Sequence, residues 1–272
     1  MKPAPFDYVR ADSADEAVAI LAEHGDEARV LAGGQSLMAM LNMRLAQPNA
    51  LVDIHRAADL AGIRLEDGRL VVRAAVTQAA LGRHPGLAQS LPLLAQALPH
   101  IGHWQTRNRG TVCGSIAHAD PSAELPLCLA TLGGDVVLRS ASGRRTLSAA
   151  EFFAGMLQTA REPTELVEEV RFPVARAGER HAFAEIAMRH GDFAIVALAV
   201  VAGPSGIRLG VGGVADRPHV ARWARLAGAA LDDALNELAW ELGARDDHHA
   251  SAAYRRHAVR TLGKQLIEGL VS

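Results

Sequence analysis

The order of expected strands and helices changes at Pro173, and this change constrains the fold more than any other feature of the chain. Before Pro173, short helical and extended segments alternate. After it, extended segments come first and long helical segments come last, an order typical of a small α+β domain. The polar stretch VARAGERH, residues 174–181, is typical of a linker. The sequence therefore predicts an α+β protein with a domain boundary near residue 175.

Capping and turn signals define most of the expected elements. Ser13 is a good helix N-cap with Glu16 three residues later, and Gly25 is a good helix end. The Asp67-Gly68 pair between two alternating runs predicts a β-hairpin over residues 62–76. Helices are expected at 13–25, 36–48, 224–242 and 251–270 and, interrupted by prolines, at 76–101. Further strands are expected at 28–32, 50–54, 135–139, 145–147, 166–172, 181–188, 194–201 and 206–213.

Charge and cysteine content exclude several classes of protein. The chain has 272 residues and a net charge of −2 at pH 7, so nothing drives it toward nucleic acid or an anionic membrane. Cys113 and Cys128 are too few for a disulfide framework or for an iron–sulfur cluster held by four thiolates. No stretch is typical of a membrane span or a secretion signal. We expect a cytoplasmic protein.

The segment VLAGGQSLMAML, residues 30–41, predicts a strand that turns through two glycines into a helix. Glycines let a backbone approach a ligand closely, and the first amides of a helix have no intrahelical partner. Such amides favour a phosphate or pyrophosphate, and Gln35 and Ser36 add side-chain donors. A plain turn before a helix would have the same pattern, so this segment alone does not establish a site.

A second segment, RNRGTVCGSIAHADPSAELP at residues 107–126, is polar and rich in small residues. Gly110, Gly114, Ser115 and Ala117 leave room for close backbone approach, and Thr111 and Ser115 carry hydroxyls. So few large side chains make a poor core but a suitable wall around a flat or phosphorylated ligand. The alternative is a long ordered surface loop.

Other patterns in the chain do not lead to a site. Residues 210–215 fit G-x-G-x-x-A but lie too late to open a dinucleotide-binding fold, so we interpret them as a tight strand end. His100 and His103 lack a third ligand of suitable spacing, so no metal site is predicted. No nucleophile elbow and no catalytic acid–base pair are found, so no catalytic residue is assigned.

Together these segments resemble the FAD-binding medium subunits of molybdenum hydroxylases, the xanthine dehydrogenase and carbon monoxide dehydrogenase family. AGGQS (32–36) and RNRGTVCGSIAHADPSAE (107–124) resemble the two flavin-binding motifs of that family. TELVEEVRFP (164–173), RHGDFAIVALAV (189–200) and GVGGVADRP (210–218) also match, in the same order. The resemblance runs from FDYVRADSADEAVAIL near the start to the last helix.

The resemblance implies a two-subdomain FAD-binding domain of the PCMH type over residues 1–175, with subdomains at about 1–58 and 59–175. A small α+β domain would follow over residues 176–272. The first motif would wrap the FAD pyrophosphate, and the second would hold the rest of the diphosphate and the ribityl region. The cofactor-binding residues implied in this way are Ala32, Gly33, Gly34, Gln35, Ser36, Ile101, Thr111, Val112, Cys113, Gly114, Ser115, Glu124, Val167, Glu185 and Phe193.

Within that set, Glu124 stands where the family has an acidic residue bonded to the cofactor. Ile101 and Val167 stand at apolar contacts with the flavin or the adenine, and Phe193 stands near the isoalloxazine ring. The chain also departs from the family pattern. Cys113 and Ser115 replace the commoner Gly and Asn, and Glu185 replaces a Lys that contacts the cofactor in some relatives.

The resemblance also implies partners. A large subunit would hold the molybdenum–pterin cofactor, a small subunit would carry two [2Fe–2S] clusters, and the assembly would be a dimer of heterotrimers. Electrons would pass from those clusters through FAD to an external acceptor. One alternative is a stand-alone flavin oxidoreductase of the same fold. Another is a non-catalytic binding or assembly module that keeps the fold without the flavin.

Overall fold

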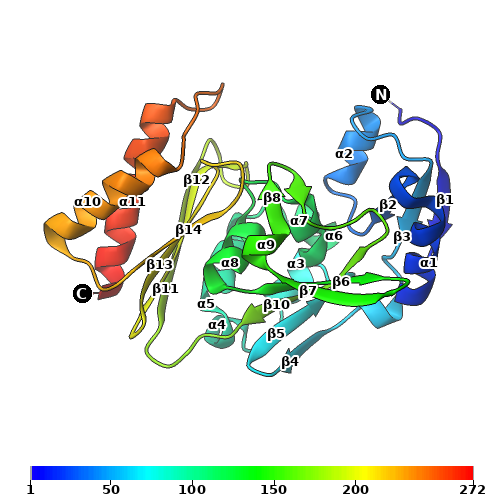
Figure 1. Ribbon diagram of the computed structural model, residues 1–272, viewed down its shortest axis with the longest axis horizontal. Helices are drawn as coiled ribbons and strands as arrows, with labels where there is room; N and C mark the ends of the chain where they lie inside the picture. The colour runs from blue at the N-terminus through cyan, green and yellow to red at the C-terminus, as the bar shows by residue number, and fades with distance from the viewer. Residues whose placement is uncertain (1, 272) are drawn as a thin grey trace.

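The computed structural model describes residues 2–271, and the chain forms three parts in a row (Figure 1). The N-terminal part holds a small parallel sheet, and the middle part holds a larger antiparallel sheet with several short helices. The C-terminal part holds an antiparallel sheet and two long helices. This arrangement confirms the predicted α+β fold.

The N-terminal part comprises β1 (Asp7–Arg10), α1 (Ala14–His24), η1 (Gly25–Glu27), β2 (Ala28–Leu31), α2 (Leu37–Asn42), β3 (Ala50–Asp53) and η2 (Ala58–Leu60). The middle part comprises β4 (Ile63–Glu66), β5 (Arg69–Arg73), α3 (Gln78–Gly82), α4 (Leu87–Ser90), α5 (Pro92–Ala97), η3 (Leu98–His100), α6 (Trp104–Arg109), α7 (Val112–His118), α8 (Glu124–Leu132), β6 (Asp135–Ser140), β7 (Gly143–Ser148), α9 (Ala149–Phe152), β8 (Phe153–Gly155), β9 (Gln158–Thr159) and β10 (Leu166–Pro173). The C-terminal part comprises β11 (Arg180–Ala187), β12 (Ala194–Gly203), β13 (Gly206–Gly212), β14 (His219–Trp223), α10 (Gly228–Glu241) and α11 (Ala252–Val271).

The N-terminal sheet has the strand order β1-β3-β2, all parallel, and α1 packs on it. The α1 helix begins as predicted, because the Ser13 hydroxyl oxygen accepts a hydrogen bond from the Glu16 amide at 3.2 Å. The helix predicted over residues 36–48 is wrong in its length, since α2 ends at Asn42. Arg44 has a φ of 56°, which a helix cannot continue, and Leu41 is the one buried residue of α2.

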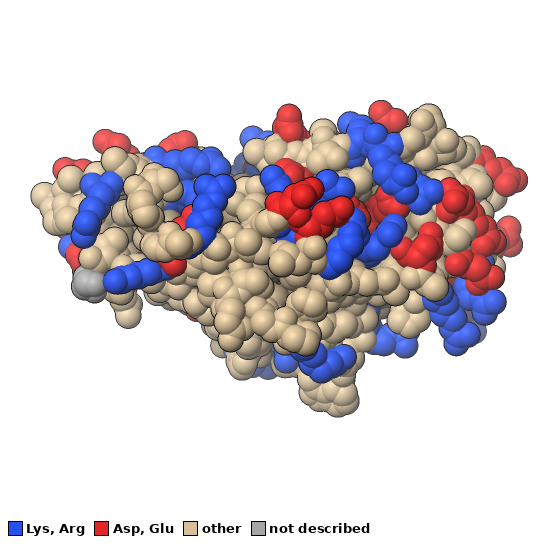
Figure 2. Space-filling model, turned by 90° about the horizontal axis from the view of Figure 1, so that it is seen from below, with Lys and Arg blue, Asp and Glu red and all other residues tan. Residues whose placement is uncertain are grey.

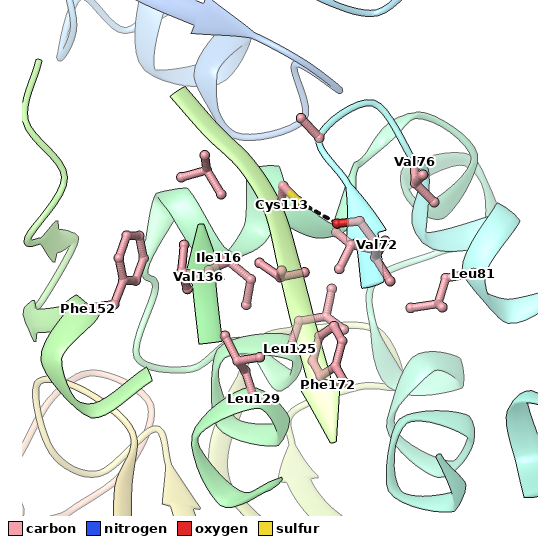
Figure 3. Close-up of a cluster of buried hydrophobic side chains, with 14 of the residues drawn as sticks. Val72, Val76, Leu81, Cys113, Ile116, Leu125, Leu129, Val136, Phe152 and Phe172 are labelled. Carbon is pink, nitrogen blue, oxygen red and sulfur yellow. Dashed lines mark hydrogen bonds between the residues drawn. The ribbon is translucent and has the colours of Figure 1, made fainter. Parts of the chain in front are cut away.

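The middle sheet has the strand order β4-β5-β10-β6-β7, all antiparallel. The predicted hairpin is confirmed, with Asp67 and Gly68 both at positive φ between β4 and β5. The core between this sheet and α7 and α8 includes Val72, Cys113 and Phe172 (Figure 3). Cys113 Sγ donates to the Val72 carbonyl oxygen at 3.4 Å, and burial raises the pKa of the Cys113 thiol. The side chain is therefore a buried thiol of the core.

The segment over residues 107–126 is more helical than its composition suggests. It contains the end of α6, all of α7 and the start of α8. Val112 and Ile116 stand four residues apart, so both face the core from α7 and both are fully buried. The short strands β8, β9 and β14 were also not predicted. Each is five residues or shorter, and their sequences lack a clear alternation of apolar and polar residues.

The C-terminal sheet lies between two helical layers, with α11 on one face and α5 and α8 on the other. Alternate residues of β12 therefore enter two different cores. Ala197 and Ala199 pack into the core of the middle part, whereas Leu198 and Val200 pack under α10 and α11. The motif over residues 210–215 covers the end of β13 and the bend after it, in agreement with the strand end interpreted from the sequence. Gly210 lets α8 approach the sheet. A Cβ on Gly210 would lie 1.9 Å from Thr131 Oγ1.

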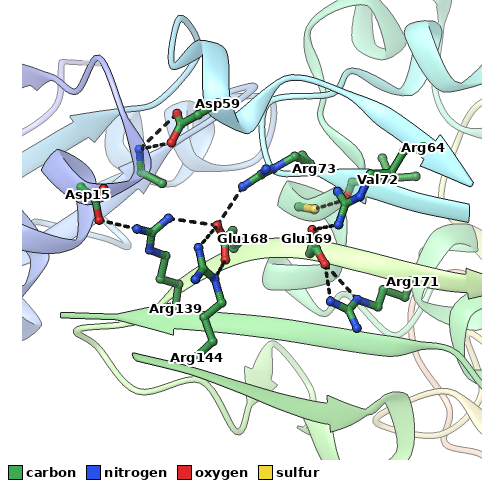
Figure 4. A network of polar contacts seen from close by, with 12 residues as sticks. Asp15, Asp59, Arg64, Val72, Arg73, Arg139, Arg144, Glu168, Glu169 and Arg171 are labelled. Carbon is green, nitrogen blue, oxygen red and sulfur yellow. Dashed lines mark hydrogen bonds and ion pairs between the residues drawn. The ribbon is translucent and has the colours of Figure 1, made fainter. Parts of the chain in front are cut away.

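A polar network joins the N-terminal and middle parts (Figure 4). The buried Glu168 carboxylate on β10 accepts from Arg73 at 2.8 Å, Arg139 at 3.1 Å and Arg144 at 2.5 Å. Arg139 also pairs with Asp15 of α1, which links α1 to β6 of the middle sheet. On the face drawn in Figure 2, charged groups of both signs are interspersed, so no broad field of one sign covers this face.

Within residues 2–271, no helix has the length and hydropathy needed to cross a bilayer.

Candidate functional site

A cavity of about 550 Å³ lies between the N-terminal part, the middle part and the turn that joins β11 to β12. Both glycine-bearing segments line it, although they are about 75 residues apart in the chain. Most of the residues that the family resemblance implies are brought together in its wall: Ala32, Gly33, Gly34, Gln35, Ser36, Ile101, Thr111, Cys113, Gly114, Ser115, Glu124, Val167 and Phe193.

The two segments touch through their backbones. A Cβ on Gly33 would lie 2.3 Å from the Arg109 carbonyl oxygen and 2.6 Å from the Gly110 Cα. Because these are backbone atoms, only a residue without a side chain lets the segments meet here. Gly33 therefore sets the width of the cavity at this point.

The first segment has free backbone amides in the wall of the cavity. Within residues 2–271, no backbone or side-chain oxygen accepts from the amides of Gly33, Gly34, Gln35 or Ser36. The Gln35 side chain folds back on this segment, because its Nε2 donates to the Gly33 carbonyl oxygen at 3.2 Å. Consecutive unbonded amides form a concavity that suits an anion.

The second segment offers a different surface. Thr111 caps α7, and its hydroxyl oxygen accepts from the Gly114 amide at 3.0 Å, while the Ser115 amide donates to the Thr111 carbonyl oxygen at 3.2 Å. These two amides are already used inside α7. The segment can therefore contribute the Ser115 hydroxyl and its small, closely packed surface to a ligand.

Glu124 is the most perturbed acid in the cavity wall. Burial raises the pKa of its carboxyl to about 8, and the negative charges of Glu185 and Asp120 add to this effect. A hydrogen bond from the Glu124 backbone amide and the positive charge of Arg107 act in the opposite direction. Near neutral pH this carboxyl therefore carries a proton and can donate a hydrogen bond.

Two residues of the implied set lie elsewhere. Val112 is fully buried, and its side chain belongs to the core between α7 and the middle sheet instead of the cavity wall. Glu185 lies on β11 outside the wall, where its Oε1 pairs with His100 Nδ1 at 3.2 Å. Burial raises the pKa of Glu185, and the neighbouring His100 partly offsets this.

Sequence reasoning missed several residues of the wall. Arg29 and Arg161 lie there, and Arg161 Nη1 donates to the carbonyl oxygens of Glu162 at 2.8 Å and Glu165 at 2.8 Å. Burial and the charge of Arg29 lower the pKa of Arg161. Gln78, at the start of α3, also lines the cavity. No local motif marks these residues, because tertiary packing alone brings them to the cavity.

The cavity is suited to a long ligand with an anionic centre and flat ends. The free amides can hold the anion without lysine, and Ile101 and Val167 supply nearly buried apolar surface. Phe193 lies at the rim with 68% of its surface exposed. Among residues 2–271 no group of three or more His, Cys, Asp or Glu side chains is placed to hold a metal ion.

Comparison with known families gives two matches that together span most of the chain. Residues 4–175 match the family described as the FAD binding domain in molybdopterin dehydrogenase. Residues 181–270 match the family described as the CO dehydrogenase flavoprotein C-terminal domain.

Individual relatives agree with these matches. The alpha subunit of the 6-hydroxypseudooxynicotine dehydrogenase complex of Paenarthrobacter nicotinovorans is 44% identical over 195 residues, which are 72% of this chain and 66% of that protein. The glyceraldehyde dehydrogenase medium chain of Sulfolobus acidocaldarius is 33% identical over 274 residues, covering 96% of this chain and 97% of that protein.

Solved structures are similar over nearly the whole length. Carbon monoxide dehydrogenase from Hydrogenophaga pseudoflava superimposes with a TM-score of 0.91 at 34% identity, covering 97% of this chain and 96% of the other. Quinoline 2-oxidoreductase from Pseudomonas putida 86 gives a TM-score of 0.93 at 32% identity, covering 99% and 98%. The chain therefore belongs to the family of FAD-binding medium subunits of molybdenum hydroxylases such as carbon monoxide dehydrogenase and xanthine dehydrogenase.

Proposed function

We propose that this chain is the electron-transfer subunit of a heteromeric molybdenum hydroxylase and holds FAD in the cavity described above. Electrons would reach the flavin from [2Fe–2S] clusters on a small partner and leave to an external acceptor. A large partner would hold the molybdenum–pterin cofactor, and the assembly would be a dimer of heterotrimers in the cytoplasm. Relatives named as medium chains and complex subunits support this division of labour.

The observation that carries the proposal is the row of four unbonded amides at Gly33–Ser36, facing a second glycine-bearing segment across one cavity. A diphosphate presents oxygen acceptors on both phosphates, which match a row of donors. Neutral amides can hold it although no lysine lines the cavity. The residues present therefore fit the central part of FAD.

The other wall residues suit the remaining parts of the cofactor. We assign Ile101 and Val167 to contacts with a flat ring, Ser115 and the protonated Glu124 carboxyl to hydrogen bonds, and Phe193 to the exposed rim. Bound FAD would supply the redox chemistry, and the protein would supply its position and its electrostatic environment. Cys113 stays in the core as a thiol with a raised pKa, so we assign it no redox role.

The proposal is tested by purifying the chain together with its partner subunits and recording a visible spectrum. We expect the absorption band of oxidised flavin at about 450 nm, released as FAD when the protein is denatured. A folded complex without flavin would overturn the proposal and favour the binding or assembly module.

Metal content separates the proposal from a stand-alone flavin oxidoreductase. We expect molybdenum and iron to co-purify with the complex and to be absent from the isolated chain, which has only 2 cysteines. Flavin together with turnover of a substrate by the isolated chain would favour the stand-alone enzyme.

A further inference from the structure

Gln78 is a buried polar side chain whose carboxamide has no hydrogen-bond partner within residues 2–271. The residue is 5% exposed, and its Oε1 is sealed from solvent without a donor. Nε2 is not among the sealed side-chain atoms, and no acceptor among these residues takes a hydrogen bond from it. A buried amide without partners is unfavourable, and such groups are rare in native proteins unless they have a functional use.

The position of Gln78 is fixed by its backbone. The Thr77 hydroxyl caps α3 by accepting from the Ala80 amide at 3.1 Å, and the Gln78 amide donates to the Gly110 carbonyl oxygen at 2.8 Å. The side chain then returns along the same loop, since a Cβ on Gly110 would lie 3.3 Å from Gln78 Nε2. Nε2 therefore lies against the residue that touches Gly33.

This location puts an unused donor where the two segments meet and where the row of free amides begins. We propose that Gln78 is a further cofactor-binding residue, whose Nε2 donates a hydrogen bond to an oxygen of the sugar–diphosphate part of the bound dinucleotide. The side chain is neutral, like the amides of Gly33–Ser36, and it extends their row of donors from α3. The inference rests on the proposed FAD site.

The test uses the full-length apo chain and measures FAD binding by calorimetry and unfolding by denaturant. Gln78→Leu removes the carboxamide at similar size, and we expect FAD to bind about tenfold more weakly. The apo form should be as stable as the wild type or more stable, because no protein hydrogen bond is lost. Equal FAD affinity in Gln78→Leu and wild type would overturn the inference.

Gln96 provides the matched control. Its Nε2 donates to the His181 carbonyl oxygen at 3.1 Å, and its Oε1 accepts from the Phe183 amide at 3.0 Å. Gln96→Leu should therefore destabilise the apo chain and leave FAD affinity unchanged. If Gln78→Leu destabilises the apo chain as much as Gln96→Leu does, the Gln78 amide is structural and the inference is wrong.

Gln78→Glu tests the direction of the hydrogen bond, because a carboxylate accepts but cannot donate. We expect this variant to bind FAD more weakly than Gln78→Leu, since it also places a negative charge beside the diphosphate. Affinity equal to wild type would mean that the ligand is the donor, which contradicts the proposal.

Binding of ADP and of FMN identifies the half of the dinucleotide that Gln78 contacts. Weaker binding of ADP alone assigns the contact to the adenosine side, and weaker binding of FMN alone assigns it to the ribityl side. If FAD weakens but neither fragment does, the effect is not a local hydrogen bond and the inference fails. If the wild-type chain binds no FAD, the proposed function fails first.

Discussion

Gly33 and Gly110 hold the two cofactor-binding segments in backbone contact, with a Cβ on Gly33 reaching to 2.6 Å from the Gly110 Cα. The contact joins the loop after β2 of the N-terminal part to the loop between α6 and α7 of the middle part. The width of the cavity at this point therefore depends on how closely the two backbones approach.

Gly33→Ala should lower FAD affinity by at least tenfold. The added methyl meets the Arg109 carbonyl oxygen at 2.3 Å, and since backbone atoms cannot rotate away, the segments must separate. Titration of the apo chain with FAD, followed by flavin fluorescence, measures the effect. Gly269→Ala is the control, because nothing lies within 4 Å of its Cβ and affinity should not change. Wild-type affinity in Gly33→Ala would refute the role given to this contact.

Glu168→Ala should destabilise the chain by about 3 kcal/mol, because it leaves Arg73 and Arg139 partly buried without their shared carboxylate. Denaturant unfolding of the apo chain measures this loss. Glu66→Ala on β4 is the control, since its pair with Arg64 is exposed and should be worth at most about 1 kcal/mol. Similar losses in both variants would show that the network contributes no more than a surface pair.

Glu168 should also make stability depend on acid pH. Burial opposes its ionisation, but hydrogen bonds from Arg144 and the charges of Arg144, Arg139 and Arg73 outweigh burial, so the pKa lies below its ordinary value. A lowered pKa gives stability that is complete above the unfolded value of about 4.3 and is lost as pH falls further. Below that pH, Glu168→Gln should lose stability less steeply than wild type in thermal unfolding. Parallel curves would contradict this.

The sequence predicted local features well. The Ser13 cap and the Asp67-Gly68 hairpin are confirmed because each depends on residues next to one another in the chain. The strand predicted over residues 194–201 is also confirmed, and the structure shows that it is buried on both faces. The second half of α2 was wrong because Met43 and Leu45 fit a helical pattern but find no core to pack against.

The sequence could predict only those residues of the site that belong to a recognisable motif. AGGQS and TVCGS, apart from Val112, line one cavity, as the family resemblance implies, but nothing in their sequence shows that Gly33 must touch Gly110. Gln78 and Arg161 reach the wall from α3 and from the loop before β10, and no sequence motif surrounds either residue. The roles of these two residues depend on how deeply they are buried and on which hydrogen-bond partners their side chains have. Only the folded chain defines both.

Glu124 should make FAD affinity fall as pH rises through about 8. Burial raises the pKa of this carboxyl to about 8, so below that pH it is neutral, and above it the carboxylate adds a negative charge to the wall of the cavity proposed to hold an anionic cofactor. The same shift makes the apo chain lose stability between the unfolded pKa of about 4.3 and pH 8, because the folded state retains the proton.

Glu124→Gln should remove both trends, because the amide keeps a donor and does not ionise. Its apo stability should match wild type near pH 4 and exceed it increasingly as the pH rises to 8. Calorimetric titrations with FAD at pH 6, 7, 8 and 9 follow the affinity. A fall in affinity that persists unchanged in Glu124→Gln would assign it to another group.

Arg255 is buried in the C-terminal domain and bonds to two backbone carbonyl groups there. Substitution of Arg255 should therefore lower the stability of the chain far more than substitution of its neighbour Arg256. It is 5% exposed, and its Nη1 donates to the carbonyl oxygens of Ile195 and Gly213, both at 2.6 Å, while Nη2 pairs with Asp247. Arg255→Met keeps an apolar stem but leaves two carbonyl groups without their donor, which should cost about 2–3 kcal/mol. Arg256 packs over the Trp240 ring at 4.1 Å, and Arg256→Met should cost at most about 1 kcal/mol. Denaturant unfolding of both variants measures the free energy of unfolding. Equal losses of this free energy in the two variants would mean that the contacts of Arg255 with the carbonyl groups do not stabilise the sheet.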